Sequence, residues 1–112
     1  MLAKQQYNRA NAYLAKEILE ATPQKLLVKI YDYTIVHCKK GDMLKTNNGI
    51  QELINGLNFD IEEAKDITSG LLMLYQFCQD QMRKGNNDVV CEILTTLKET
   101  WISAFNKETL KV

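Results

Sequence analysis

The chain of 112 residues has one proline, one histidine, three cysteines and no excess charge. A two-metal carboxylate bundle needs a Glu-x-x-His motif on each of two helices, and one histidine cannot supply both. The three cysteines, Cys38, Cys78 and Cys91, form no Cys-x-x-Cys pair. We expect each to be a small buried residue of a protein in a reducing cytosol. Fourteen basic and fourteen acidic residues cancel, which leaves no electrostatic case for nucleic acid.

Membrane and catalytic signals are also missing. No apolar run approaches the ~18 residues of a membrane span, and the first six residues lack the apolar core of a signal peptide. Gly-rich phosphate loops, Ser-His-Asp sets and nucleophile elbows do not occur. His37 shares its predicted helix with Asp32 and Lys40, which favours a surface or half-buried residue over a general base. We therefore expect a soluble cytoplasmic protein that is not an enzyme and has no cofactor or metal.

Helix formers dominate, and strict alternation of apolar and polar residues is absent. Thr22-Pro23 predicts the start of a helix, because threonine caps helices and proline fits the first helical position. Residues 1–21, which include Tyr13, are interpreted as a separate arm or short helix. Residues 22–112 are interpreted as the helical bundle of one domain. In the first bundle helix an i, i+3, i+4, i+7 stripe marks a buried face at Leu27, Ile30, Tyr31, Thr34, Ile35 and Cys38.

Three further helices follow in the prediction. Gly41-Asp42 weakens the first bundle helix, and Asn47-Asn48-Gly49 predicts a turn before a helix that carries residues 50–57. The next helix begins with Asp60 as its cap and ends at Gly85-Asn86, and the last begins at Asn86-Asn87-Asp88. Short connections between these amphipathic segments predict an all-α, antiparallel four-helix bundle with the arm as a fifth element.

Apolar and aromatic residues exceed what four short helices can enclose. The run from Leu71 to Tyr75 is apolar around the whole helix, so it is either fully enclosed or covered by a partner. Every helix of a small bundle touches solvent, which favours a surface where a partner helix docks in a groove. An ordinary core with a homodimer face is the alternative.

Several runs resemble the flagellin export chaperone (FliS) family. AYLAKEILEATPQKLLVKIYDYTI, residues 12–35, is similar to the start of that family, with its tyrosine, its Thr-Pro turn and its Leu-Tyr-Asp core. ELINGLNF (52–59), GLLMLYQF (70–77) and LTTLKETW (94–101) resemble its third, fourth and last helices. Residues 31–57 are fewer than the family usually has there, and Glu62-Glu63-Ala64 stands where it often has Gly-Gly.

The resemblance implies a cytoplasmic chaperone that binds the disordered C-terminal segment of flagellin in a hydrophobic groove. Such a chaperone prevents early polymerisation and hands its client to the flagellar type III export apparatus. The family's arm covers the pocket that the client uses, with Tyr13 as the plug. Resemblance and apolar stripes together predict partner contacts at Tyr13, Leu27, Ile30, Tyr31, Thr34, Leu53, Leu57, Leu74 and Tyr75. A core position is the alternative for each, and a self-associating bundle with a homodimer interface is the competing function.

Overall fold

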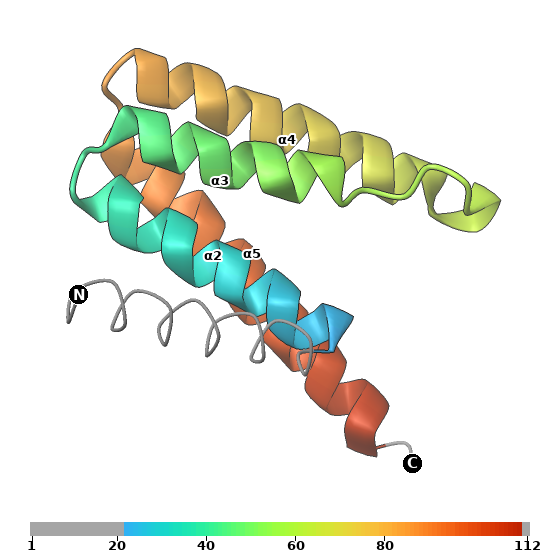
Figure 1. Ribbon diagram of the computed structural model, residues 1–112. Coiled ribbons are helices and arrows are strands. Elements are labelled where there is room, and N and C mark those ends of the chain that lie inside the picture. Colours follow the sequence, from blue (N-terminus) through green and yellow to red (C-terminus); the bar gives the residue numbers. More distant parts are fainter. Residues whose placement is uncertain (1–21, 111–112) are drawn as a thin grey trace, which may run out of the picture.

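The computed structural model describes residues 22–110, and side chains through Lys107 (Figure 1). These residues form the helices α2 (Pro23–Lys39), α3 (Met43–Asn55), α4 (Lys65–Arg83) and α5 (Asn87–Leu110), with one 3-10 turn, η1 (Glu62–Ala64). No strand occurs in this part of the chain. The predicted all-α class with four packed helices is confirmed. The predicted arm, including Tyr13, lies outside the described residues.

The predicted start of α2 at Thr22-Pro23 is confirmed. Thr22 has an extended backbone, and its hydroxyl accepts a hydrogen bond from the Lys25 backbone N–H at 3.2 Å. Pro23 occupies the first helical position, where its missing N–H removes no intrahelical bond. This cap fixes where the regular helix begins, and therefore which side chains of α2 face the other helices.

The predicted turn at Asn47-Asn48-Gly49 is wrong, because the chain reverses earlier. Gly41 has φ +72°, and its N–H donates to Cys38 O while the Asp42 N–H donates to His37 O, both at 3.0 Å. These two bonds form a Schellman motif, which ends α2. The Asp42 carboxylate then accepts from the Lys45 N–H at 3.0 Å and caps α3.

Gly49 therefore lies inside α3, where it serves close packing rather than a turn. A Cβ added at Gly49 would collide with the Thr34 hydroxyl of α2. The missing side chain lets the two helices approach closely.

The predicted cap of α4 at Asp60 is also wrong. The Asp60 N–H donates to the Asn58 side-chain oxygen at 2.9 Å, so Asn58 makes the local polar contact of this connection. η1 follows, and α4 begins only at Lys65, without a side-chain cap. The predicted stop and restart at Gly85 to Asn87 is confirmed. Gly85 has φ +80°, and its N–H and that of Asn86 repeat the Schellman bonds of α2.

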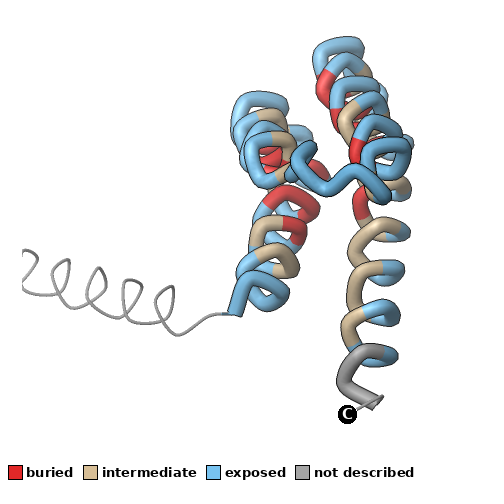
Figure 2. Tube along the Cα trace, turned by 90° about the vertical axis from the view of Figure 1, so that its right-hand side faces the viewer, coloured by how far each residue is buried: buried red, intermediate tan, exposed pale blue. Residues whose placement is uncertain are grey.

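One core joins all four helices. α2 packs on α3 and α5, and α4 packs on α3 and α5. The buried apolar residues are Tyr31, Ile35, Cys38, Ile50, Leu53, Tyr75, Cys78, Met82, Val90 and Leu94. Figure 1 shows α3 and α4 lying across the top, while α2 and α5 extend below them. Figure 2 shows that burial is concentrated in the upper part, whereas α5 is intermediate or exposed toward the end marked C.

The predicted burial of the cysteines is confirmed for two of the three residues. Cys38 and Cys78 are fully buried, whereas Cys91 is half-buried, and all three are free thiols. Among the described helices, none combines the length and the apolar character that crossing a membrane requires.

Candidate functional site

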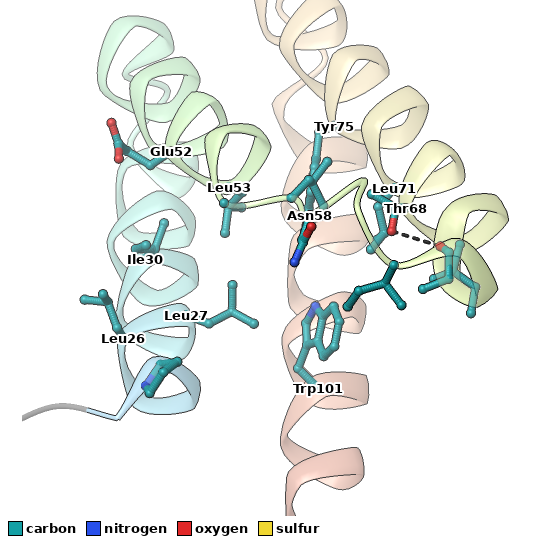
Figure 3. Close-up of a pocket in the computed structure, with 16 residues that line it drawn as sticks. Leu26, Leu27, Ile30, Glu52, Leu53, Asn58, Thr68, Leu71, Tyr75 and Trp101 are labelled. Atoms are coloured by element: carbon teal, nitrogen blue, oxygen red, sulfur yellow. Dashed lines mark hydrogen bonds between the residues drawn. The ribbon is translucent and has the colours of Figure 1, made fainter.

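An apolar groove of about 430 Å³ lies where α2 and α5 extend past the α3–α4 pair (Figure 3). It is bounded by the first half of α2, the end of α3, residues 56–64, the first three turns of α4 and Trp101 of α5. In Figure 3, Leu27 of α2 and Trp101 of α5 point into the same space from opposite sides. A cavity of this size lies in the range of ligand-binding pockets.

The structure brings five of the predicted contact residues together in this groove. The lining includes Leu27, Ile30, Leu53, Leu57 and Tyr75. They come from three helices and the residue after the α3 cap. With Leu57 counted to α3, residues from different elements are 18 to 48 positions apart in the sequence. Leu27, Ile30 and Leu57 are half-buried, so each presents part of its side chain to the groove.

The other predicted contacts do not line the groove. Tyr31 and Thr34 are fully buried, and the Thr34 hydroxyl donates to Ile30 O at 2.7 Å. Both therefore belong to the core, and the prediction that they touch a partner is corrected. Leu74 is half-buried on α4 but outside the lining. Tyr13 lies outside the described residues.

Sequence reasoning missed part of the groove wall. Trp101 lies seven residues after Leu94 and four after Leu97, a spacing that puts all three on one helical face and could have indicated its position. Ile61 and Ile67 also line the groove, on either side of η1. No periodic signal marked Ile61, because the path of an irregular connection is not encoded in helical spacing. Ile67 lies in α4, four residues before Leu71, and this helical spacing did mark it as apolar, although not as part of a groove.

The rim of the groove is apolar and open to solvent. Leu26, Ile61 and Ile67 are 38%, 49% and 67% exposed. They lie on two opposite banks, α2 on one side and the connection with α4 on the other. Burying such side chains is favourable by roughly 25 cal/mol per Å² of apolar surface. The rim therefore extends the surface that a partner could cover beyond the cavity itself.

A polar network lies at the inner end of this apolar groove. The hydroxyl oxygens of Tyr31 and Tyr75 are 2.5 Å apart, and the Trp101 indole N–H donates to the Tyr31 hydroxyl at 3.1 Å. Burial, together with the bond to Tyr75, raises the pKa of Tyr31 far above its ordinary value. Burial also raises the pKa of Tyr75. Both hydroxyls are therefore neutral at physiological pH and act as hydrogen-bonding groups.

The groove offers little for acid–base chemistry. Glu52 is the one ionisable carboxylate in the lining, and no histidine or cysteine contributes to it. His37 is half-buried elsewhere on α2, where its ring meets Tyr33 edge-on at 4.5 Å. Within the described part of the chain, no group of three His, Cys, Asp or Glu side chains could hold a metal ion.

No family model, curated protein or solved structure matches this chain in comparisons with known proteins.

Proposed function

We propose that this protein is a cytoplasmic export chaperone that binds the disordered C-terminal segment of flagellin in the groove between α2 and α5. The observation that carries the proposal is an open apolar groove whose rim residues Leu26, Ile61 and Ile67 remain exposed. A disordered client loses conformational entropy when it becomes ordered on binding, and burial of apolar side chains compensates for that loss.

The choice of client comes from the residue patterns. The runs that resemble the flagellin export chaperone family include Leu27, Ile30, Leu53, Leu57, Tyr75 and Trp101, all of which line the groove. The client would insert apolar side chains at helical spacing, as amphipathic segments do in grooves. It would thereby be kept from polymerising until the flagellar export apparatus receives it.

The proposal includes the antiparallel helix order and the arm. Three connections of at most nine residues join the four helices, and such short connections favour reversal of direction at each step. Tyr13 remains the predicted plug, since its segment joins the bundle next to Pro23, which lines the groove.

The proposed role is binding rather than catalysis, because the lining holds no pair of acid and base side chains.

The test is a titration of the full chain with a flagellin C-terminal peptide. Ile67→Asp introduces a charge at the rim, on a side chain that is 67% exposed and contributes little to folding. We expect peptide affinity to fall on the order of tenfold, because apolar burial is lost and a carboxylate is desolvated. Met73→Asp is the matched control, since Met73 lies on the same helix, is 71% exposed and is outside the lining.

Equal binding by both variants, or no binding of the peptide by the unchanged protein, would count against the proposal. The same variants address the second candidate, a self-associating bundle with a homodimer interface. That candidate is favoured by the exposed pair Met73 and Phe77 on α4, outside the groove. Sedimentation equilibrium would then show a dimer that Met73→Asp disrupts and Ile67→Asp leaves intact. A strict monomer excludes it.

A further inference from the structure

We infer that Tyr31 is a positioning residue, which fixes the indole ring of Trp101 as the α5 wall of the groove. This assignment rests on the proposed function only in taking the groove as a binding site. Tyr31 is fully buried and does not line the groove, so a partner cannot touch it. Trp101 lines the groove and is bonded to Tyr31. Any effect of Tyr31 on a partner therefore acts through Trp101.

The indole ring needs such a constraint. Trp101 of α5 is only partly buried and packs at the margin of the core, so its surroundings alone do not fix the ring. Its ring stacks on Phe105, one turn further along α5, with centroids 5.8 Å apart and planes 25° apart. This contact restrains one face of the ring. The bond from the indole N–H to Tyr31 restrains its edge, so rotation about the side-chain torsions is limited.

The hydrogen bonds among Tyr31, Tyr75 and Trp101 also connect three of the helices that surround the groove. Tyr31 belongs to α2, Tyr75 to α4 and Trp101 to α5. The Tyr75 hydroxyl, 2.5 Å from that of Tyr31, holds the acceptor for Trp101 in position. An indole N–H removed from water without an acceptor is unfavourable, so this ring orientation depends on the Tyr31 oxygen.

The arrangement specifies part of the partner's chemistry. With its N–H engaged by Tyr31, the ring offers the groove apolar surface rather than a free donor. An apolar anchor of the partner, aliphatic or aromatic, would pack against it and face Leu27 across the groove (Figure 3). A polar side chain at that position would find no partner on Trp101 and would be rejected.

The test compares two variants that each delete one hydroxyl of the same buried bond. Tyr31→Phe removes the acceptor of the indole N–H and keeps the ring volume. Tyr75→Phe removes the Tyr31–Tyr75 bond but leaves that acceptor in place. Tyr31→Phe loses two buried bonds and Tyr75→Phe loses one, so we expect the melting temperature to fall further for Tyr31→Phe. A merely structural role for Tyr31 would make the two variants alike in every other respect.

The distinguishing readout is the fluorescence of Trp101, the only tryptophan of the chain. Without any partner, Tyr31→Phe should raise the acrylamide quenching constant about twofold and lower the anisotropy, because the ring gains freedom. Tyr75→Phe keeps the acceptor of the indole N–H and should therefore change both quantities clearly less than Tyr31→Phe does. The double variant removes both oxygens and should match or exceed Tyr31→Phe. Quenching of Tyr31→Phe equal to that of the unchanged protein would overturn the inference.

A second measurement needs no variant and covers the case in which Tyr31→Phe does not fold. Hydrogen exchange of the single indole N–H, followed by NMR in the unchanged protein, should be slower on the order of tenfold or more than in a denatured reference. Exchange as fast as in that reference would also overturn the inference.

Binding of the flagellin peptide separates this inference from the proposed function. We expect Tyr31→Phe to weaken binding about fivefold more than Tyr75→Phe does, because a freely rotating ring must be ordered on binding. If the peptide binds no form of the protein while the fluorescence and exchange results hold, the proposed client is wrong and the positioning role stands. If the peptide binds all forms equally, the positioning role fails and the client stands.

Discussion

Single side chains at the helix contacts decide how closely the helices of this protein approach. Gly49 of α3 faces Thr34 of α2, whose hydroxyl is already bonded to Ile30 O at 2.7 Å. That hydroxyl cannot move away without losing its acceptor. Gly70 of α4 is the opposite case, since nothing lies within 4 Å of the position where its Cβ would be. Packing therefore requires glycine at position 49 and does not require it at position 70.

We expect Gly49→Ala to lower the free energy of unfolding by about 1–3 kcal/mol, because the added methyl overpacks the α2–α3 contact. Gly70→Ala should raise it by up to about 1 kcal/mol, because alanine favours the helix and meets open space. Urea denaturation measures both. Equal effects of the two changes would contradict the proposed packing of Gly49 against Thr34.

Buried titratable side chains make the stability depend on pH. Burial raises the pKa of the Cys78 thiol from its ordinary value of 9.0 to about 11. Burial and the contact with Cys91 raise the pKa of Cys38 to about 12. Burial also raises the pKa values of Tyr31 and Tyr75. In each case the folded protein retains a proton that the unfolded chain releases.

This part of the stability should therefore be fully present below about pH 9, the ordinary pKa of the thiol in the unfolded chain. It should fall as pH rises from there toward the folded pKa of about 11. Between pH 9 and 11 the unfolded chain binds fewer protons than the folded one. Each such group then lowers the free energy of unfolding by about 1.4 kcal/mol per pH unit. Cys78→Ala should flatten the slope by about that amount, as measured by urea titrations at several pH values. A slope that Cys78→Ala leaves unchanged would show that Cys78 does not titrate in this way.

At the scale of elements, one ion pair and two contacts of cysteine sulfur atoms join α2 to α5. Asp32 and Lys98 form an ion pair along the outer side of this pair. Cys91 of α5 donates to the Cys38 sulfur of α2 at 2.8 Å, and Cys38 also contacts the Asn87 carbonyl at 3.4 Å. The sulfur contacts lie at the end of the helix pair away from the groove, since Cys38 is in the last turn of α2 and Asn87 begins α5. They hold the helices together there, while the Tyr31–Trp101 bond acts nearer the groove.

We predict that glutathione disulfide links α2 to α5 through Cys38 and Cys91. The half-buried Cys91 attacks first and releases one glutathione, and Cys38 then displaces the second, so that one disulfide forms for one consumed. The closing step is slow at neutral pH, since the pKa of Cys38 is raised to about 12. A link across 53 positions should stabilise the fold by about 4 kcal/mol.

Mass spectrometry and thermal unfolding check this prediction. Oxidised protein should lose two hydrogens, leave only Cys78 free and unfold at a higher temperature. Cys91→Ser should show neither change. A stable mixed disulfide at Cys91, with no release of the second glutathione, would show that the two sulfurs cannot reach bonding geometry.

At the scale of the whole molecule, the fold leaves large apolar side chains in solvent. Ile67, Met73 and Leu44 are each about two-thirds exposed or more, at 67%, 71% and 67%. They lie on α3 and α4, which also form one side of the groove. The formal net charge is zero, so association with a partner would depend on apolar burial rather than on long-range attraction.

Binding of the flagellin peptide should therefore show a negative heat-capacity change. Burial of about 2,000 Å² of mostly apolar surface corresponds to roughly −0.3 kcal/mol/K. Calorimetry at four temperatures between 10 and 35 °C measures it. Affinity should change little between low and high salt, in contrast to a charge-driven complex. A heat-capacity change near zero with strong salt dependence would contradict apolar burial as the driving force.

The sequence by itself determined the helical class, the start of α2, the stop at Gly85 and the restart at Asn87. Each of these depends on residues within one or two turns, such as the Thr22 cap, and local hydrogen bonds are encoded by neighbouring residues. The sequence also indicated five groove residues, because apolar stripes mark the faces that helices turn toward one another. It misjudged the reversal before α3, because Gly41-Asp42 and Asn47 to Gly49 are both turn signals by composition.

Only the tertiary structure decided between those two signals and between core and groove. Gly49 lies within a helix, and the position requires glycine because Thr34, fifteen positions earlier, occupies the space of a side chain there. Tyr31 and Tyr75 belong to the same apolar faces as their neighbours, yet one lies behind the groove and the other lines it. That difference arises from how the four helices pack around the two tyrosines. It depends on contacts between distant residues, which helical periodicity does not specify.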